Sequence, residues 1–169
     1  MEEHRATTTA HRLLGQISPL FKQRGRRRGT TVIGTASGDP HALPSAILAD
    51  LLSDRRLDVV DLGANTPAES FVEAANEADG LVGIGVCLTL DELIEPTLEL
   101  LATVRNECPG IMLVAGGPAV ARNGKPFERV ADHVTSTAAE VCDLFEAATT
   151  TTPAASDTAE MEAQQRASG

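Results

Sequence analysis

The strongest constraint on the fold of this chain is a regular alternation of two hydrophobic patterns. Short runs of β-branched and aliphatic residues, typical of buried strands, are each followed by a longer segment with apolar residues at helical spacing. The predicted strands cover residues 31–35, 58–62, 81–86, 111–115 and 133–136, and the predicted helices cover residues 43–53, 67–76, 91–108, 119–130 and 138–147. Such alternation over short loops predicts an α/β fold with a parallel sheet covered on both faces. Pro96 is expected to kink the third helix or to delay its start.

Composition divides the chain into four parts. Residues 1–23 predict an amphipathic helix whose apolar stripe must pack on another surface, and the stripe consists of Ala6, Ala10, Leu13, Leu14, Ile17 and Phe21. Residues 24–29 form a basic linker, either solvated or in contact with phosphate. Residues 30–148 form the compact domain, and residues 149–169 are expected to be a disordered tail. The expected architecture is therefore a flavodoxin- or Rossmann-like five-stranded parallel sheet with flanking helices, preceded by one N-terminal helix.

Charge and residue usage exclude several classes of function. A net charge of −10 and an aromatic content of 2% argue against direct nucleic-acid binding, which relies on basic surfaces and base stacking. The three cysteines, Cys87, Cys108 and Cys142, are too few and too widely spaced for a zinc site or a disulfide framework. No apolar run is long enough for a membrane span and no export signal is evident, so we expect a cytoplasmic protein with reduced thiols.

The loop after the first predicted strand carries Asp39 and His41. In an open parallel sheet, ligands bind outside the carboxyl ends of the strands, where this loop lies. An Asp two residues before a His can accept one imidazole N–H and leave the other nitrogen free to bind a metal. Asp and His are also ordinary turn and cap residues, so the pair by itself leaves both interpretations open.

Two further loops lack large side chains at the same edge. The third strand runs through Gly85 to Cys87 and Thr89, and the fourth ends in Gly116-Gly117. These glycines predict either tight turns or the close approach of a bulky ligand to the backbone. No dinucleotide-binding or P-loop glycine motif follows a strand, and no nucleophile elbow is present.

Together these loops resemble the cobalamin-binding domain family, whose signature is Asp-x-His-x-x-Gly after the first strand, Ser-x-Leu after the third and Gly-Gly after the fourth. Asp39-Pro40-His41 and Gly116-Gly117 match it. The resemblance implies that His41 ligates cobalt from below in the base-off mode, that Asp39 orients it, and that the glycines make room for the nucleotide tail.

The chain departs from the signature at two positions. Pro44 stands at the family's last glycine, and Gly85-Val86-Cys87 stands in the Ser-x-Leu slot, so the usual hydroxyl partner of the buried base is missing. Thr89 could substitute for that hydroxyl from further along the loop. We therefore expect the nucleotide tail to contribute less to binding than it does elsewhere in the family.

The segment around Glu3 and His4 resembles the last cap helix of light-sensing, adenosylcobalamin-binding transcriptional regulators. That resemblance implies adenosylcobalamin as the cofactor, with Glu3 and His4 on its upper side. An exposed Glu-His pair at a frayed end is the alternative.

These features favour a cobalamin-binding sensor or regulatory module, with a photoreceptor-like light response, rather than an enzyme. The alternative is a corrinoid carrier or the cobalamin-binding subunit of a methyltransferase or radical mutase, and a third interpretation is a flavodoxin-like domain that has lost its cofactor. The expected partners are a small-molecule corrinoid and either a second copy of the chain or a regulatory protein.

Overall fold

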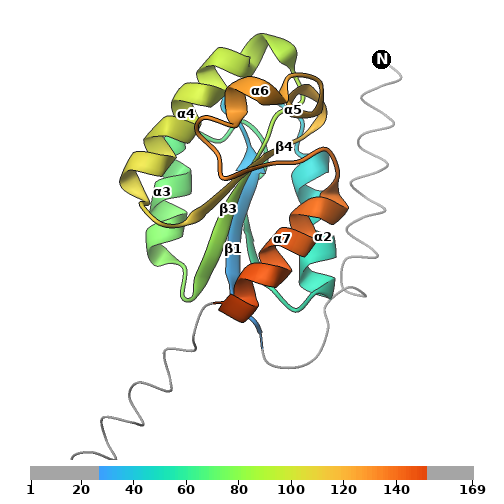
Figure 1. Cartoon of the computed structure of the whole chain (residues 1–169), viewed down its shortest axis with the longest axis vertical. Coiled ribbons are helices and arrows are strands. Elements are labelled where there is room, and N and C mark those ends of the chain that lie inside the picture. Colours follow the sequence, from blue (N-terminus) through green and yellow to red (C-terminus); the bar gives the residue numbers. More distant parts are fainter. Residues whose placement is uncertain (1–26, 152–169) are drawn as a thin grey trace, which may run out of the picture.

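The computed structural model describes residues 27–151, in which strands and helices alternate along the chain (Figure 1). The strands are β1 (Thr30–Thr35), β2 (Asp58–Asp61), β3 (Leu81–Cys87), β4 (Met112–Gly116) and β5 (His133–Val134). The helices are α2 (Leu43–Asp54), α3 (Ala68–Glu77), the 3₁₀ turn η1 (Asp91–Leu93), α4 (Ile94–Glu107), α5 (Pro118–Arg122), α6 (Gly124–Phe127) and α7 (Ala138–Thr151). The predicted helix over residues 1–23 and the expected tail beyond residue 151 lie outside the described residues.

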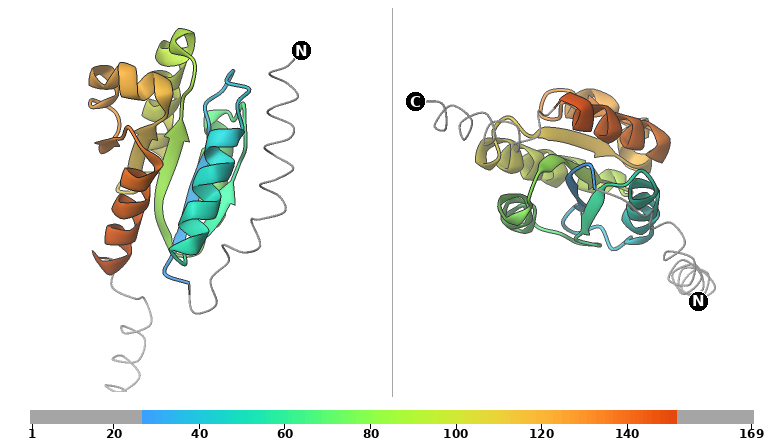
Figure 2. Two further views of the ribbon diagram at one scale, coloured as in Figure 1. Left: turned by 90° about the vertical axis from the view of Figure 1, so that its right-hand side faces the viewer. Right: turned by 90° about the horizontal axis from the view of Figure 1, so that it is seen from below.

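The five strands form one parallel sheet in the order β2-β1-β3-β4-β5, which confirms the predicted fold class. Helices α2 and α7 lie side by side on one face, and α3 to α6 cover the other (Figures 1 and 2). Strand β1 illustrates why both faces are apolar: Val32 packs into the core under α3 and α4, whereas the adjacent Ile33 packs into the core under α2 and α7. Alternating side chains of a central strand therefore bury on opposite faces.

Three helical segments differ clearly from the sequence prediction. The predicted helix over residues 119–130 is wrong, because the chain bends at Asn123 and forms two short helices, α5 and α6. Helix α4 begins only at Ile94, which places Pro96 in its first turn, where a missing N–H costs no hydrogen bond. Helix α7 continues to Thr151, so residues 149–151 are helical rather than the start of a disordered tail.

Close packing of α7 on β3 depends on a glycine. A Cβ atom built on Gly83 would lie 2.6 Å from Cε1 of Phe145, a distance that real Cβ atoms do not tolerate. The fully buried Phe145 ring therefore rests directly on the β3 backbone. One turn earlier on α7, Val141 packs in the same core cluster and lines a cavity.

Candidate functional site

A buried carboxylate organises the loop at the carboxyl end of β1. Asp39 is 0% exposed, and its Oδ1 lies 2.7 Å from Nδ1 of His41 and accepts a hydrogen bond from the His41 backbone N–H at 3.2 Å. The loop is held to β1 by Thr35, whose hydroxyl donates to the His41 carbonyl at 3.0 Å. At its other end, the Gly38 N–H donates to Oδ1 of Asn65 at 2.7 Å. Asp39 and His41 are thus brought together as predicted.

Thr89, which follows β3, completes this cluster. Its backbone N–H donates to Oδ2 of Asp39 at 2.6 Å, and its Oγ1 lies 2.8 and 2.7 Å from the two carboxylate oxygens. The same hydroxyl lies 2.9 Å from Nδ1 of His41. Thr89 thus holds the Asp39–His41 pair, and its expected replacement of the missing hydroxyl of the Ser-x-Leu slot stays a prediction.

The electrostatics of the cluster favour an ionised Asp39. Burial acts to raise the pKa of this carboxyl group, but the hydrogen bonds from Thr89 and His41 outweigh it and hold the pKa below its usual value. The charged carboxylate in turn favours the His41 tautomer that carries its proton on Nδ1. Nε2 then has a free lone pair, and the His41 side chain is 51% exposed. The geometry therefore presents one imidazole nitrogen, ready to coordinate, at the edge of the sheet.

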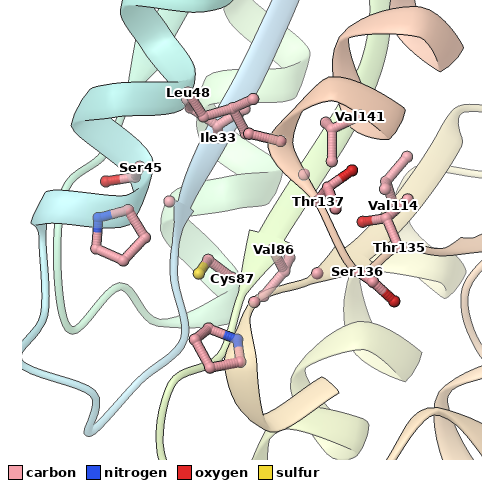
Figure 3. Close-up of a pocket in the computed structure, with 17 residues that line it drawn as sticks. Ile33, Ser45, Leu48, Val86, Cys87, Val114, Thr135, Ser136, Thr137 and Val141 are labelled. Carbon is pink, nitrogen blue, oxygen red and sulfur yellow. The ribbon is translucent and has the colours of Figure 1, made fainter. Parts of the chain in front are cut away.

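Beside this cluster a cavity of about 410 Å³ opens between α2 and α7 (Figure 3). Its walls come from the ends of β1, β3 and β4, from the first half of α2, from the start of α5, and from the beginning of α7 with the segment that leads into it. The lining residues are Ile33, Gly34, Pro44, Ser45, Leu48, Gly85, Val86, Cys87, Val114, Gly116, Gly117, Pro118, Thr135, Ser136, Thr137, Ala138 and Val141. The predicted residues Pro44, Gly85, Cys87, Gly116 and Gly117 therefore share one cavity.

Two glycines show why the cavity needs residues without side chains. At Gly117, φ is +103°, and an added Cβ would lie 2.5 Å from the Leu88 carbonyl oxygen, so this position is closed to other residues. At Gly85 an added Cβ would meet Cγ2 of Ile33 at 3.3 Å and would occupy part of the cavity. Gly117 thus shapes the turn, whereas Gly85 leaves room for a ligand.

Cys87 lies in the cavity wall but is not an activated nucleophile (Figure 3). Burial, and secondarily the negative charge of Asp39, raise the pKa of its thiol to about 12. Such a thiol is protonated at neutral pH and acts as a small apolar side chain.

Sequence reasoning missed the hydroxyl residues Thr135, Ser136 and Thr137, which line the cavity on the α7 side. The sequence prediction placed the first two in the fifth strand, but β5 ends at Val134. A run of three hydroxyl residues between a strand and a helix was the available signal. Glu3 and His4 lie outside the described residues, so their predicted place over a cofactor stays a prediction.

The basic linker is partly visible at the opposite edge of the sheet. Arg27 pairs with Asp58 at 3.3 Å, and Arg28 pairs with Glu146 at 2.5 Å. These two arginines therefore contact carboxylates of the domain.

Within residues 27–151, no group of three or more His, Cys, Asp and Glu side chains is placed to hold a metal ion. In the same range, no helix is both long and apolar enough to cross a membrane.

A profile of the B12-binding domain matches residues 29–135. This chain belongs to the B12-binding domain family. The match covers the sheet, the Asp39–His41–Thr89 cluster and most of the cavity wall. It confirms the predicted cobalamin-binding domain family and a corrinoid as the ligand class.

Several corrinoid proteins are similar to this chain. The trimethylamine corrinoid protein 1 of Methanosarcina mazei is 43% identical over 56 residues, which are 33% of this chain and 26% of the relative. The dimethylamine corrinoid protein 3 of Methanosarcina acetivorans is 32% identical over 85 residues, 50% of this chain and 39% of the relative. The chain thus spans well under half the length of these relatives.

Solved structures share the fold. The monomethylamine corrinoid protein of Methanosarcina barkeri superimposes with a TM-score of 0.63 at 19% identity, covering 76% of this chain and 61% of that one. The methanol:cobalamin methyltransferase complex MtaBC of the same organism gives 0.63 at 23% identity, covering 82% of this chain and 53% of that one. The narrower resemblance to light-sensing transcriptional regulators gains no support from these proteins, which are named as corrinoid and methyltransferase proteins.

Proposed function

We propose that this domain is a corrinoid carrier that binds cobalamin with His41 as the lower cobalt ligand and serves a methyl-transfer system. The observation that carries the proposal is the half-exposed imidazole whose Nδ1 is held by the buried Asp39, next to an apolar cavity of about 410 Å³. The names of the similar proteins favour this carrier function over the sensor function that the Glu3–His4 segment suggested. Methyl-transfer partners and the form of the upper ligand, adenosyl or methyl, belong to the same proposal.

The residues present fit such a ligand. Nε2 of His41 would bind the metal, and the cavity beside Gly85, Gly116 and Gly117 would accept the nucleotide tail that the imidazole displaces. When bound, the corrinoid supplies the organometallic chemistry, in which a group is carried on cobalt. The chain's own part is to keep the proton of His41 on Nδ1, to hold the ring in place through Asp39 and Thr89, and to exclude water from the tail with an apolar lining.

The test is a spectroscopic titration with hydroxocobalamin. The wild-type protein should shift the absorption spectrum to that of a histidine-ligated, base-off species, and His41→Ala should lose this shift and bind much more weakly. Asp39→Asn should weaken binding roughly 10–100-fold, as expected for the partner of a metal-ligating histidine. His133→Ala, on β5 and outside the cavity, is the matched control. An unchanged spectrum and affinity for His41→Ala would refute the proposal.

A second titration isolates the cavity. Cobinamide lacks the tail base, so Val141→Phe, which fills the cavity from α7, should weaken cobalamin binding and leave cobinamide binding unchanged. The wild-type preference for cobalamin over cobinamide should also be modest, since Gly85 offers no hydroxyl to the base. Equal losses for both ligands would show that the tail does not occupy this cavity.

A further inference from the structure

Helix α2 exposes an apolar stripe that nothing within residues 27–151 covers. Leu43, Ile47 and Leu51 follow one another at four-residue spacing along its outer side, and Ile47 and Leu51 are 40% and 36% exposed. The inner side, with Leu48 and Leu52, already packs on the sheet. A helix that is apolar on both sides is typical of a buried element, so the outer stripe calls for a covering surface.

The chain enters the domain at the foot of this helix. The Arg28 N–H donates to the carbonyl of Arg56 at 3.0 Å, just after the C-terminal end of α2, and Arg27 pairs with Asp58 at the start of β2. Residues 1–26 therefore join the domain at the end of α2 that lies furthest from His41.

The length of this segment suits the stripe. As a helix, residues 6–21 would measure about 24 Å at about 1.5 Å per residue, whereas α2, with 12 residues, spans about 18 Å. Residues 22–26 can bridge up to about 17 Å, enough for the chain to turn back along α2.

We propose that residues 6–21 pack as an amphipathic helix against Leu43, Ile47 and Leu51, antiparallel to α2. The stripe Ala6 to Phe21 would then cover the exposed face of α2. An antiparallel course carries the beginning of the segment to the carboxyl edge of the sheet, the edge that presents His41. The surface formed by Leu43, Ile47 and Leu51 is thus covered by a segment of the same chain.

A second copy of the chain fits this stripe less well. Three partly exposed side chains offer far less than the roughly 800 Å² per partner that stable complexes bury. A tethered segment needs less contact area, because its association is intramolecular and its effective concentration is high.

Hydroxyl-radical footprinting of the full chain tests the proposal, with oxidation of Ile47, Leu51 and Val60 as readouts. Val60 is 36% exposed on the edge strand β2 and is the matched control. In the variant Leu13→Gln/Leu14→Gln/Ile17→Gln, oxidation of Ile47 and Leu51 should rise several-fold while that of Val60 stays constant. Because this triple substitution lies outside the described core, the fold should be retained, which far-UV circular dichroism checks.

Two outcomes would overturn the docking. Unchanged oxidation of Ile47 and Leu51 in the triple variant would show that the segment does not cover the stripe. If the wild-type protein has a doubled mass in light scattering, and the protection of Ile47 and Leu51 from oxidation disappears on dilution, the stripe is covered by a second copy of the chain. A monomeric mass with concentration-independent protection supports the proposal.

Discussion

Replacing Thr89 with valine removes one hydroxyl from a buried carboxylate and keeps the shape of the side chain. The hydroxyl lies 2.7 to 2.8 Å from both oxygens of Asp39, which is fully buried, whereas the backbone N–H bond from residue 89 survives the substitution. A hydrogen bond to a charged group contributes about 1.5–3 kcal/mol, so Thr89→Val should lower the free energy of unfolding by about 2 kcal/mol at pH 7. Urea denaturation of the cofactor-free protein measures this loss.

The loss should depend on pH in a defined direction. The pKa of Asp39 in the folded protein is depressed by Thr89 and His41, so the carboxylate contributes stability above its unfolded pKa of about 3.9, and this stability is lost as the pH falls through the folded pKa. The difference in the free energy of unfolding between wild type and Thr89→Val should therefore have its full size at pH 7 and become smaller below about pH 4.

Thr97→Val is the matched control for this measurement. Thr97 is also buried, but its hydroxyl donates to the neutral carbonyl of Leu93 at 2.7 Å. Its substitution should cost about 1 kcal/mol, with no dependence on pH in this range. Equal losses for the two variants, or a Thr89→Val loss that persists undiminished in acid, would refute the argument that Thr89 stabilises an ionised Asp39.

Two further predictions concern the cavity wall. Gly117→Ala should destabilise the protein by several kcal/mol more than Gly80→Ala. Both glycines have positive φ, so the backbone strain of the substitution is common to them. An added Cβ would meet nothing within 4 Å at Gly80, whereas at Gly117 it would lie 2.5 Å from the Leu88 carbonyl oxygen. Similar urea midpoints for the two variants would exclude a backbone clash at Gly117. Cys87 should resist alkylation by iodoacetamide at pH 8, since a pKa of about 12 leaves roughly one thiol in ten thousand ionised. Mass spectrometry compares the alkylation rate of Cys87 in the native protein with that in the urea-unfolded protein. Rapid alkylation in the native protein would contradict a buried, protonated thiol.

Periodicity predicted the parallel sheet and the Asp39–His41 pair because both depend on local patterns. A strand-loop-helix unit places its loop at the carboxyl edge whatever the neighbouring units do, so two residues in one loop meet predictably. The position of Thr89 depended on how the β3 loop crosses to the β1 loop, which no local spacing encodes. The break between α5 and α6 was indicated locally by Asn123, Gly124 and Pro126, residues that disfavour a continuous helix. The spacing of the apolar residues on both sides of the break nevertheless resembled that of one helix. The cavity hydroxyls after β5 were missed because the strand proved only two residues long.

The contact of Phe145 with Gly83 fixes the distance between α7 and the sheet at one point. At that point the helix cannot move closer to the sheet, because the ring already rests on the backbone, and any side chain at Gly83 would lift it. One turn away, the same helix forms the wall of the cavity through Val141 and Ala138. The contact between Phe145 and Gly83 therefore limits how closely α7 approaches the sheet, and neither residue is part of the cavity lining. A substitution at Gly83 or Phe145 would change both the packing of the core and the position of the helix that lines the cavity. Selection for stability and selection for ligand binding therefore act on the same pair of residues.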